Sequence, residues 1–343
     1  MKNKQRNEYV DILRGLAILM VVLCHTITGN TTGWEHNFIF NVIWCLQMPL
    51  FMLISGYVTR YTKNINNRKL LYSYLKRRTV AYLMPWIVWT FFIRGIILNQ
   101  KNFLNPRYIF WNMDSGYWFL FSIWTISVIF LISTYISNKL YTKQNKILKI
   151  FITGGIYILG MVFLMLVAVI FGTKFATIKL TLYYMPFYFI GYMFGQLQEE
   201  INIKISKKQV ELFVAICFLV TVFSLLRVDL YSISDSGIGI IIRPTISLIG
   251  CIGFVGIVVQ CCKISNSIWG GVLAWCGKHS MEIYLSHYLF LNLLKVHNIC
   301  NLMTLQSTII VIMNYMTTLL LTIGILKIIK NKYIHLMLFA KPI

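Results

Sequence analysis

Residues 9–28 read YVDILRGLAILMVVLCHTIT, a stretch made mostly of Ile, Leu, Val and Met that nevertheless carries Asp11, Arg14 and His25. About 20 residues is the length at which an α-helix crosses the hydrocarbon core of a membrane. Charged groups inside such a helix cost about 2.5–3.5 kcal/mol each on insertion scales, so they normally face a protein interior or a wet cavity. The stretch therefore predicts a first membrane-spanning helix with a polar face.

The three ionisable residues share one side of this helix. Arg14 and His25 are 11 residues apart, which at 100° per residue is three turns plus about 20°. Asp11 precedes Arg14 by three residues and joins the same stripe. We interpret the stripe as the wall of an active site. The alternative is an ion-paired anchor at the membrane edge with an interfacial histidine. Asp11 fits both interpretations equally, whereas the in-phase spacing of Arg14 and His25 favours a function for that pair.

The composition is typical of a polytopic helical membrane protein. Of the 343 residues, 58% are hydrophobic and only 12% are charged, which excludes an ordinary soluble domain. We expect an all-α bundle in one membrane-embedded domain, residues 1–343, without an appended soluble domain. The first apolar run has no small-residue cleavage site, so we expect it to be retained as a span. Ten spans are expected, at 9–28, 38–58, 79–98, 117–137, 148–171, 180–198, 209–226, 238–260, 279–296 and 303–326.

The net charge of +22 indicates the orientation in the membrane rather than a nucleic-acid partner. Most of the 32 Lys and Arg residues fall in alternate loops and at the two termini. By the positive-inside rule, the loops that follow the second and fourth spans, and both termini, are cytoplasmic. We therefore expect a multi-pass protein of the cell (plasma) membrane.

The most basic loop, residues 59–78, ends in Lys76-Arg77-Arg78. A topology determinant explains most of its charges. The alternative is an anionic cytosolic ligand, such as a nucleotide cofactor with several phosphates, which would explain why three cations stand together at the membrane edge. Arg77 and Arg78 are the candidate residues for binding such a ligand.

The eight cysteines are scattered, mostly in apolar segments, and contain no CxxC pair. We expect small buried hydrophobic side chains rather than a metal site or a disulfide framework. The residues are Cys24, Cys45, Cys217, Cys251, Cys261, Cys262, Cys276 and Cys300.

Three further features bear on the fold. Pro49 in the second span removes a helix hydrogen bond and should kink the helix, either opening a cavity or serving packing alone. Trp118 follows the outer loop and is expected in the aromatic belt of the membrane interface, with a sugar-stacking platform as the weaker alternative. Residues 264–278 are amphipathic and should lie along the cytoplasmic surface.

Residues 277–287, GKHSMEIYLSH, supply a second group of polar side chains. Ser280 with Glu282 nearby should cap the start of a helix, where a carboxylate also gains from the helix dipole. His287 lies two turns deeper, beyond Tyr284, and is the second intramembrane histidine. Taken alone, such a histidine is more often structural than functional.

Together these motifs resemble the integral membrane acyltransferases of the acyltransferase-3 type, which O-acetylate cell-surface polysaccharides, peptidoglycan and other acceptors. The resemblance covers essentially the whole chain. Its most specific part is Arg14 followed after ten residues by His25. The supporting motifs, in chain order, are PLFMLISGY (49–57), RRTVAYLMPWIVW (77–89), Trp118-Phe119-Leu120 and GKHSMEIYLSH (277–287).

The resemblance implies transfer of an acyl group, most simply from acetyl-CoA on the cytoplasmic side, to a hydroxyl of a cell-surface or lipid-linked saccharide, with no metal. His25 would be the general base for the acceptor hydroxyl, or would carry the acyl group briefly, because imidazole titrates near working pH. Arg14 would grip the donor, together with Arg77 and Arg78 at its phosphates. The expected supporting residues are Asp11, Trp118, Ser280, Glu282, Tyr284 and His287.

The sequence departs from the family pattern in two ways. Many members have a histidine just before the Trp-Phe-Leu triplet, where this chain has Gly116 and Tyr117. Many also carry a fused extracytoplasmic hydrolase-like domain, whereas this sequence ends at Ile343 without one. We therefore expect the protein to act alone or with a separate extracytoplasmic partner.

A transporter or flippase of an envelope glycan precursor is the competing class of protein. Its polar stripe would be a proton relay or a substrate path, and ten spans fit it equally well. The paired broken helices and internal two-fold pattern of secondary transporters are missing from the sequence, although Pro49 and Pro244 give that class slight support. A structural subunit of an envelope assembly would leave the Arg14 and His25 pair unexplained.

Overall fold

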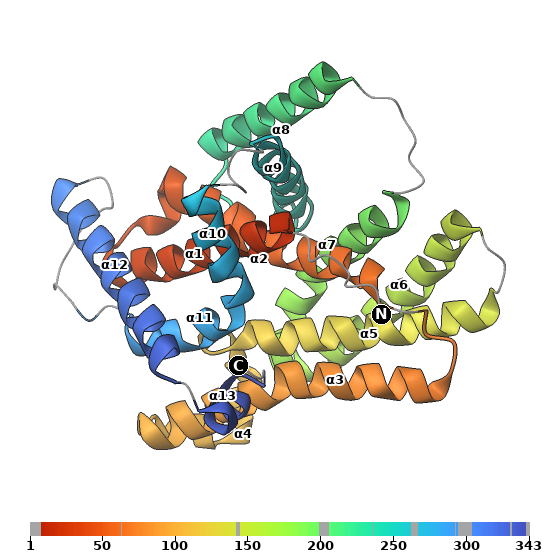
Figure 1. Ribbon diagram of the computed structural model, residues 1–343, viewed down its shortest axis with the longest axis horizontal. Helices are drawn as coiled ribbons and strands as arrows, with labels where there is room; N and C mark the ends of the chain where they lie inside the picture. Colours follow the sequence, from red (N-terminus) through yellow and green to blue (C-terminus); the bar gives the residue numbers. More distant parts are fainter. Residues whose placement is uncertain are drawn as a thin grey trace. The chain divides into compact units, whose positions relative to one another are not determined.

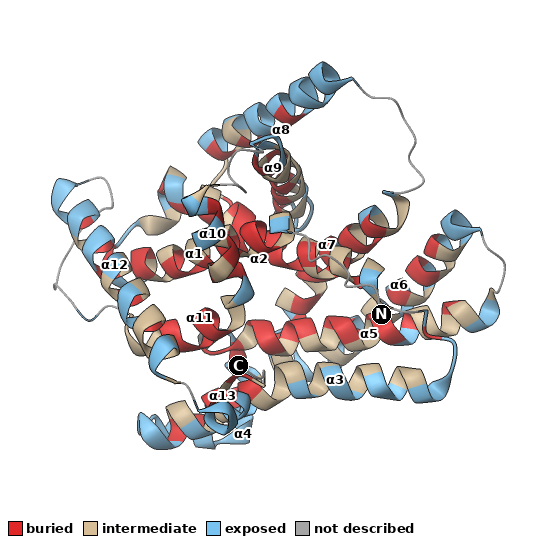
Figure 2. Cartoon of the chain, viewed as in Figure 1, coloured by how far each residue is buried: buried red, intermediate tan, exposed pale blue. Residues whose placement is uncertain are grey.

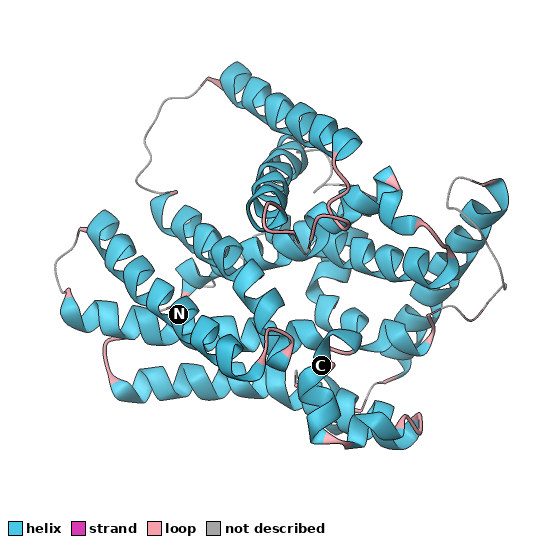
Figure 3. Ribbon diagram, turned by 180° about the vertical axis from the view of Figure 1, so that it is seen from behind, coloured by secondary structure: helices cyan, strands magenta, loops and turns pink. Residues whose placement is uncertain are grey.

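The fold is built from helices (Figure 1). The computed structural model describes residues 8–62, 64–141, 145–198, 206–234, 236–261, 267–291, 293, 304–329 and 331–340. Within these ranges every regular element is a helix, as Figure 3 shows from behind. The expectation of an all-α fold is confirmed.

Eight helices in the described ranges are long and apolar enough to cross a membrane, at eight of the ten expected places. Most of their ends fall within a few residues of the expected ones. They are α1 (Glu8–Asn30), α2 (Phe38–Tyr57) with η2 (Val58–Tyr61), α3 (Arg68–Ile87) with the π-helix η3 (Val88–Ile97), α5 (Trp118–Leu140), α6 (Lys146–Phe171), α8 (Lys207–Arg227), α9 (Gly239–Gln260) and α12 (Leu305–Ile328).

The expected third span begins too late. α3 starts at Arg68, where the side chain of Asn67 accepts a hydrogen bond from the backbone N–H of Leu70 and caps the helix. The segment 59–78 is therefore not one basic loop, because its second half is helical. Arg77 and Arg78 consequently have fixed directions on a helix.

The ninth expected span, 279–296, is wrong as a single helix. The chain instead forms α10 (Ile268–Lys278), the seven-residue α11 (Ser280–Ser286) and η8 (His287–Leu289). His279, whose φ of −105° and ψ of 18° leave the α-helical region, separates α10 from α11 at the expected boundary. The difference from the expectation is that α11 ends at Ser286 and is followed by a 3-10 helix. The sixth expected span does form a 20-residue helix, α7 (Ile178–Leu197), but its four tyrosines make it less apolar than the eight spanning helices.

Two other expected segments lie partly outside the described residues. Residues 292 and 294–296 of the expected ninth span, and residues 264–266 of the expected surface helix, lie outside the described residues. α10 is the described part of that surface helix, and its place on the cytoplasmic surface stays a prediction. α2 continues through Pro49 as a helix.

The helices group into two compact units. The first comprises Met1–Ile54 and Ile203–Ile328, and the second comprises Ser55–Asn202 and Ile329–Ile343. Each unit combines segments that are far apart in the sequence. Each is described by itself below.

α1 is the central helix of the first unit and is buried along much of its length (Figure 2). α10 packs directly against it. A Cβ atom at Gly15 would lie 2.0 Å from the carbonyl oxygen of Leu273, and one at Gly277 would lie 1.8 Å from the carbonyl oxygen of Asp11. The two glycines therefore let the backbones of α1 and α10 touch.

The rest of the first unit is arranged around α1. α12 contacts α1 through the hydroxyl of Tyr315, which donates to the carbonyl of Leu19 at 3.4 Å. α8 and α9 pair where Gly253 faces Cys217. Outside the spans, His36 of η1 (Trp34–His36) binds the carboxylate of Asp229 at 2.9 Å, and this hydrogen bond raises the pKa of His36.

The second unit is built on α3, α5, α6 and α7. A Cβ at Gly56 would lie 1.9 Å from the carbonyl oxygen of Tyr188, so the end of α2 and α7 are in backbone contact. The indole N–H of Trp89 donates to the carbonyl of Leu338 at 2.9 Å and holds the last helix in place. The short helices of this unit are η4 (Lys101–Leu104), α4 (Pro106–Trp111), η5 (Met113–Ser115), η6 (Phe175–Thr177) and α13 (Lys332–Phe339).

Candidate active site

α1 carries the expected polar stripe into the packed interior of the first unit. Asp11 is only 2% exposed and lies beneath α10, while Arg14 and His25 are half-buried. At 1.5 Å per residue, Arg14 and His25 are about 16 Å apart along the helix axis. The two residues therefore lie at separate points along the helix.

His25 meets the short helix η8. Its Nε2 atom and the hydroxyl of Tyr288 share a hydrogen bond of 3.0 Å. The ring of His287 completes the group, with its centroid 5.4 Å from that of His25 and 4.3 Å from that of Tyr288. The structure thus brings together the two intramembrane histidines that the sequence predicted, and it adds Tyr288, which the sequence analysis missed.

The tautomer of His287 follows from its hydrogen bond. Its Nδ1 atom lies 3.1 Å from the carbonyl oxygen of Ile283. Because a carbonyl only accepts, Nδ1 carries the proton, and Nε2 of the neutral ring is left as an acceptor. His287 is completely buried, and Nε2 has no hydrogen-bond partner among the described residues. A buried acceptor of this kind is costly unless it has a function or receives a donor from a bound molecule.

The remaining polar residues of this segment lie just before the histidine. Glu282 is completely buried, and its Oε1 atom lies 3.3 Å from Nδ1 of His279. Tyr284 is buried with its ring centroid 6.0 Å from that of His287. The expected cap at Ser280 is wrong: Ser280 is the first residue of α11, and the capping position is His279, whose side chain makes no capping bond. Only His279 separates α10 from α11, and the backbone N–H of Ile283 donates to the carbonyl of His279 as in a continuous helix.

α12 adds a buried polar face that the sequence analysis missed. Asn314 donates to the side-chain oxygen of Asn30 on α1 at 2.9 Å, and Thr318 donates to the carbonyl of Phe290 at 3.1 Å. The spacing of 7, 4 and 4 residues, which marks one helical face, was the available signal. The residues on this face are at most 1% exposed: Ser307, Asn314, Thr318 and Thr322. Two of these residues thus tie α12 to α1 five residues after His25 and to the residue that follows η8.

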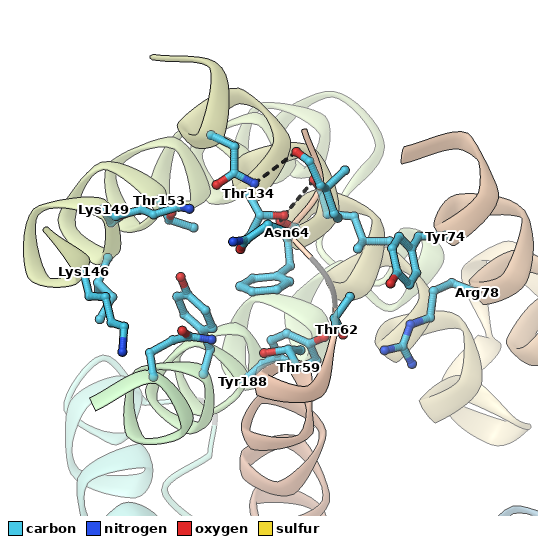
Figure 4. A pocket seen from close by; sticks show the side chains of 17 residues that line it. Thr59, Thr62, Asn64, Tyr74, Arg78, Thr134, Lys146, Lys149, Thr153 and Tyr188 are labelled. Carbon is cyan, nitrogen blue, oxygen red and sulfur yellow. Dashed lines mark hydrogen bonds between the residues drawn. The ribbon is translucent and has the colours of Figure 1, made fainter. Parts of the chain in front are cut away.

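In the second unit, Arg78 lines a cavity of about 150 Å³ (Figure 4). Lys146 and Lys149 of α6 line it as well, on the wall across from Arg78. Hydroxyl and amide side chains surround these cations, and none of the 17 lining residues is acidic. Arg77 is exposed and does not line the cavity, so the structure separates the two arginines that the sequence placed together.

Trp118 also belongs to the second unit. Its ring is stacked on that of Tyr184, with centroids 5.7 Å apart and planes 18° from parallel. Both the aromatic belt and the sugar platform remain compatible with this position. Of the cysteines, Cys24, Cys45, Cys217, Cys251 and Cys276 are buried as expected, Cys261 is exposed, and Cys262 and Cys300 lie outside the described residues.

Comparison with known proteins identifies the family. The family model described as an acyltransferase domain, of the acyltransferase-3 type, matches residues 7–327. The chain is also 25% identical over 230 residues to the nodulation protein NolL of Sinorhizobium fredii (strain NBRC 101917 / NGR234), which covers 61% of this chain and 56% of that protein. The aligned part is thus little more than half of the relative's length. No solved structure matches the chain. Since the family model covers nearly the whole sequence, the chain belongs to the acyltransferase-3 family of membrane acyltransferases.

Proposed function

We propose that the protein is an acyl-CoA-dependent O-acyltransferase of the plasma membrane, which moves an acetyl group to a hydroxyl of a cell-surface or lipid-linked saccharide. The observation that carries the proposal is the hydrogen bond of 3.0 Å between His25 Nε2 and a hydroxyl, that of Tyr288. A general base must lie within such reach of the hydroxyl proton that it removes. The hydroxyl of Tyr288 shows that an oxygen can lie within hydrogen-bond distance of His25 Nε2, as the hydroxyl of an acceptor must.

The chain supplies the proton chemistry of the reaction. His25 takes the proton of the acceptor hydroxyl as the oxygen becomes nucleophilic, either directly or through the hydroxyl of Tyr288. His287 presents its unprotonated Nε2 beside this pair and orients a hydroxyl by accepting from it. Acetyl-CoA would supply the acetyl thioester, whose carbonyl carbon bonds to the acceptor oxygen while the thiolate leaves.

The cavity of the second unit supports a nucleotide donor. A nucleotide donor carries phosphates, which require cations and hydrogen-bond donors and are repelled by carboxylates. The cavity offers Arg78, Lys146 and Lys149 with no acidic residue in its lining. The residues present therefore fit the donor's phosphates. In the first unit, Arg14 would hold the polar arm of the donor, with Asp11 as its positioning residue.

Three arguments support the acceptor and the location. The family that the sequence resembles modifies polysaccharides and other envelope acceptors, and eight helices of the described chain can span a membrane. Trp118 stacked on Tyr184 offers the kind of aromatic surface on which sugars pack. A separate extracytoplasmic partner would complete the transfer where a fused domain does so in other members.

The direct test is transfer of radiolabel from acetyl-CoA in inverted membrane vesicles, with wild type and His25→Ala compared at equal expression. We expect label in membrane glycan or lipid-linked sugar with wild type and none above background with the variant. Near-normal turnover by His25→Ala would overturn the assignment of His25. If wild type fails with a panel of acyl donors and native acceptors, the proposal is wrong, and transport of an envelope glycan precursor becomes the function to test.

A further inference from the structure

We infer that the cavity lined by Arg78, Lys146 and Lys149 binds a phosphomonoester group, namely the terminal phosphate at the nucleotide end of the donor. The inference rests on the proposed function, since it names the donor by the group that the protein grips. It adds Lys146 and Lys149, which the sequence offered only as loop charges. Three observations carry it: the absence of a carboxylate partner for Arg78 and Lys149 in the described part of the chain, the size of the cavity and the way its walls are fixed.

The first observation concerns Arg78 and Lys149, which meet no carboxylate among the described residues. The guanidinium of Arg78 donates one N–H to the hydroxyl of Tyr82 at 3.0 Å, which leaves four of its five donors for a ligand. Neither Arg78 nor Lys149 forms an ion pair with a carboxylate anywhere in the described part of the chain. Cations inside a protein are normally paired, and these two converge from α3 and α6 on one cavity.

The second observation is the size. A cavity of about 150 Å³ is much larger than the ~10–15 Å³ that one water requires. It is smaller than the ~300–1,000 Å³ of a site that encloses a whole drug-sized ligand. The cavity therefore suits a charged end group, with the rest of the donor lying outside it. Two fixed positive charges or more are what a doubly charged phosphomonoester requires and a singly charged phosphodiester does not.

The third observation is that the walls are held in place. The side-chain N–H of Asn138 on α5 donates to the carbonyl of Ile65 at 3.0 Å and ties the segment after η2 to the cavity wall. Thr153 on α6 donates to the carbonyl of Lys149 at 2.8 Å, and Thr59 donates to that of Gly56 at 2.6 Å. A binding site with its backbone fixed in this way loses little conformational entropy when the ligand enters.

The experiment uses the full-length protein in lipid nanodiscs and two readouts. Binding of adenosine 3′,5′-bisphosphate is measured by calorimetry, with adenosine 5′-monophosphate and phosphatidic acid as competitors. Initial rates are measured with acetyl-CoA and with its 3′-dephospho analogue. The variants are Arg78→Gln and Lys149→Gln, and the control is Lys69→Gln, which removes an exposed cation from the same helix α3 outside the cavity.

We expect Arg78→Gln and Lys149→Gln each to weaken bisphosphate binding and to raise the KM for acetyl-CoA about tenfold, with kcat and the KM for the dephospho analogue nearly unchanged. Lys69→Gln should behave as wild type. Unchanged binding in both cavity variants would overturn the inference, and so would competition by phosphatidic acid alone.

The two proposals fail separately. If no transfer is found but bisphosphate binding depends on Arg78 and Lys149, the phosphate site stands and the proposed reaction falls. If transfer from acetyl-CoA is found but neither variant changes binding or KM, the reaction stands and the phosphate site falls.

Discussion

At the residue scale, the hydroxyl of Tyr288 is the group that connects the candidate active site. Tyr288 holds Nε2 of His25 and packs its ring 4.3 Å from that of His287, so a single side chain links both histidines. In the proposed mechanism, Tyr288 either relays the acceptor proton or holds the imidazole of His25 in its orientation. Both roles depend on its oxygen and not on its ring.

Tyr288→Phe should lower kcat about three- to tenfold and leave the KM for acetyl-CoA unchanged, because one net hydrogen bond to His25 is lost while packing is kept. The measurement is steady-state kinetics of label transfer. Tyr315→Phe is the matched control, since that hydroxyl only donates to a backbone carbonyl of α1. If kcat of Tyr288→Phe equals that of wild type, Tyr288 is a packing residue.

The sequence predicted part of this site. The phase of Arg14 and His25 on one helix, and the position of His287 within an apolar run, marked both histidines. Their meeting could not be derived, because it depends on how η8 lies against α1. Tyr288 was overlooked because a tyrosine in an apolar run is common, and nothing in its spacing distinguishes it.

At the element scale, the contact between α1 and α10 positions the polar stripe. Gly15 and Gly277 allow the two backbones to touch, which covers Asp11 and sets the direction in which the chain continues into α11. Length and apolarity predicted most of the helices. The boundary near residue 279 was expected, but the end of α11 at Ser286 was not, because an apolar run is equally compatible with one long helix and with a short helix followed by a 3-10 turn.

Gly277→Ala should reduce the free energy of unfolding by about 1–3 kcal/mol or more, because the added Cβ would lie 1.8 Å from a carbonyl oxygen of α1 and the helices must separate. Unfolding in mixed micelles followed by circular dichroism measures this. Gly271→Ala on the same helix is the control: a Cβ there meets nothing within 4 Å and should raise helix stability by up to about 1 kcal/mol. Equal stability of the two variants would mean that α10 does not pack on α1 as described.

At the scale of the whole molecule, the loop charges and the structure agree on one point. The charge pattern assigns the loops after the second and fourth spans to the same side of the membrane, and Arg78, Lys146 and Lys149 from those two regions line a single cavity. Charge alone could not give the two units, because it reports only on which side a loop lies and not which helices pack together.

The orientation itself is open to a labelling test. In a cysteine-free background, Lys101→Cys should react with a membrane-impermeant maleimide in intact cells, and Lys69→Cys should react only after the cells are broken, because the positive-inside rule places Lys69 in the cytoplasm. Both positions are exposed. The reverse pattern would put the cationic cavity outside the cell, away from any cytosolic nucleotide.

The bond between Asn30 of α1 and Asn314 of α12 has a consequence for biogenesis. Asn30 precedes Asn314 by 284 residues in the chain, so α1 finds this polar partner only after α12 has been synthesised. His25 likewise finds Tyr288 only after the segment that carries η8 has been made. Until then, α1 lacks both of these partners. If His25 is the catalytic base that we propose, a chain that stops before η8 and α12 lacks its neighbours and should be inactive, so that it would not hydrolyse the acyl donor.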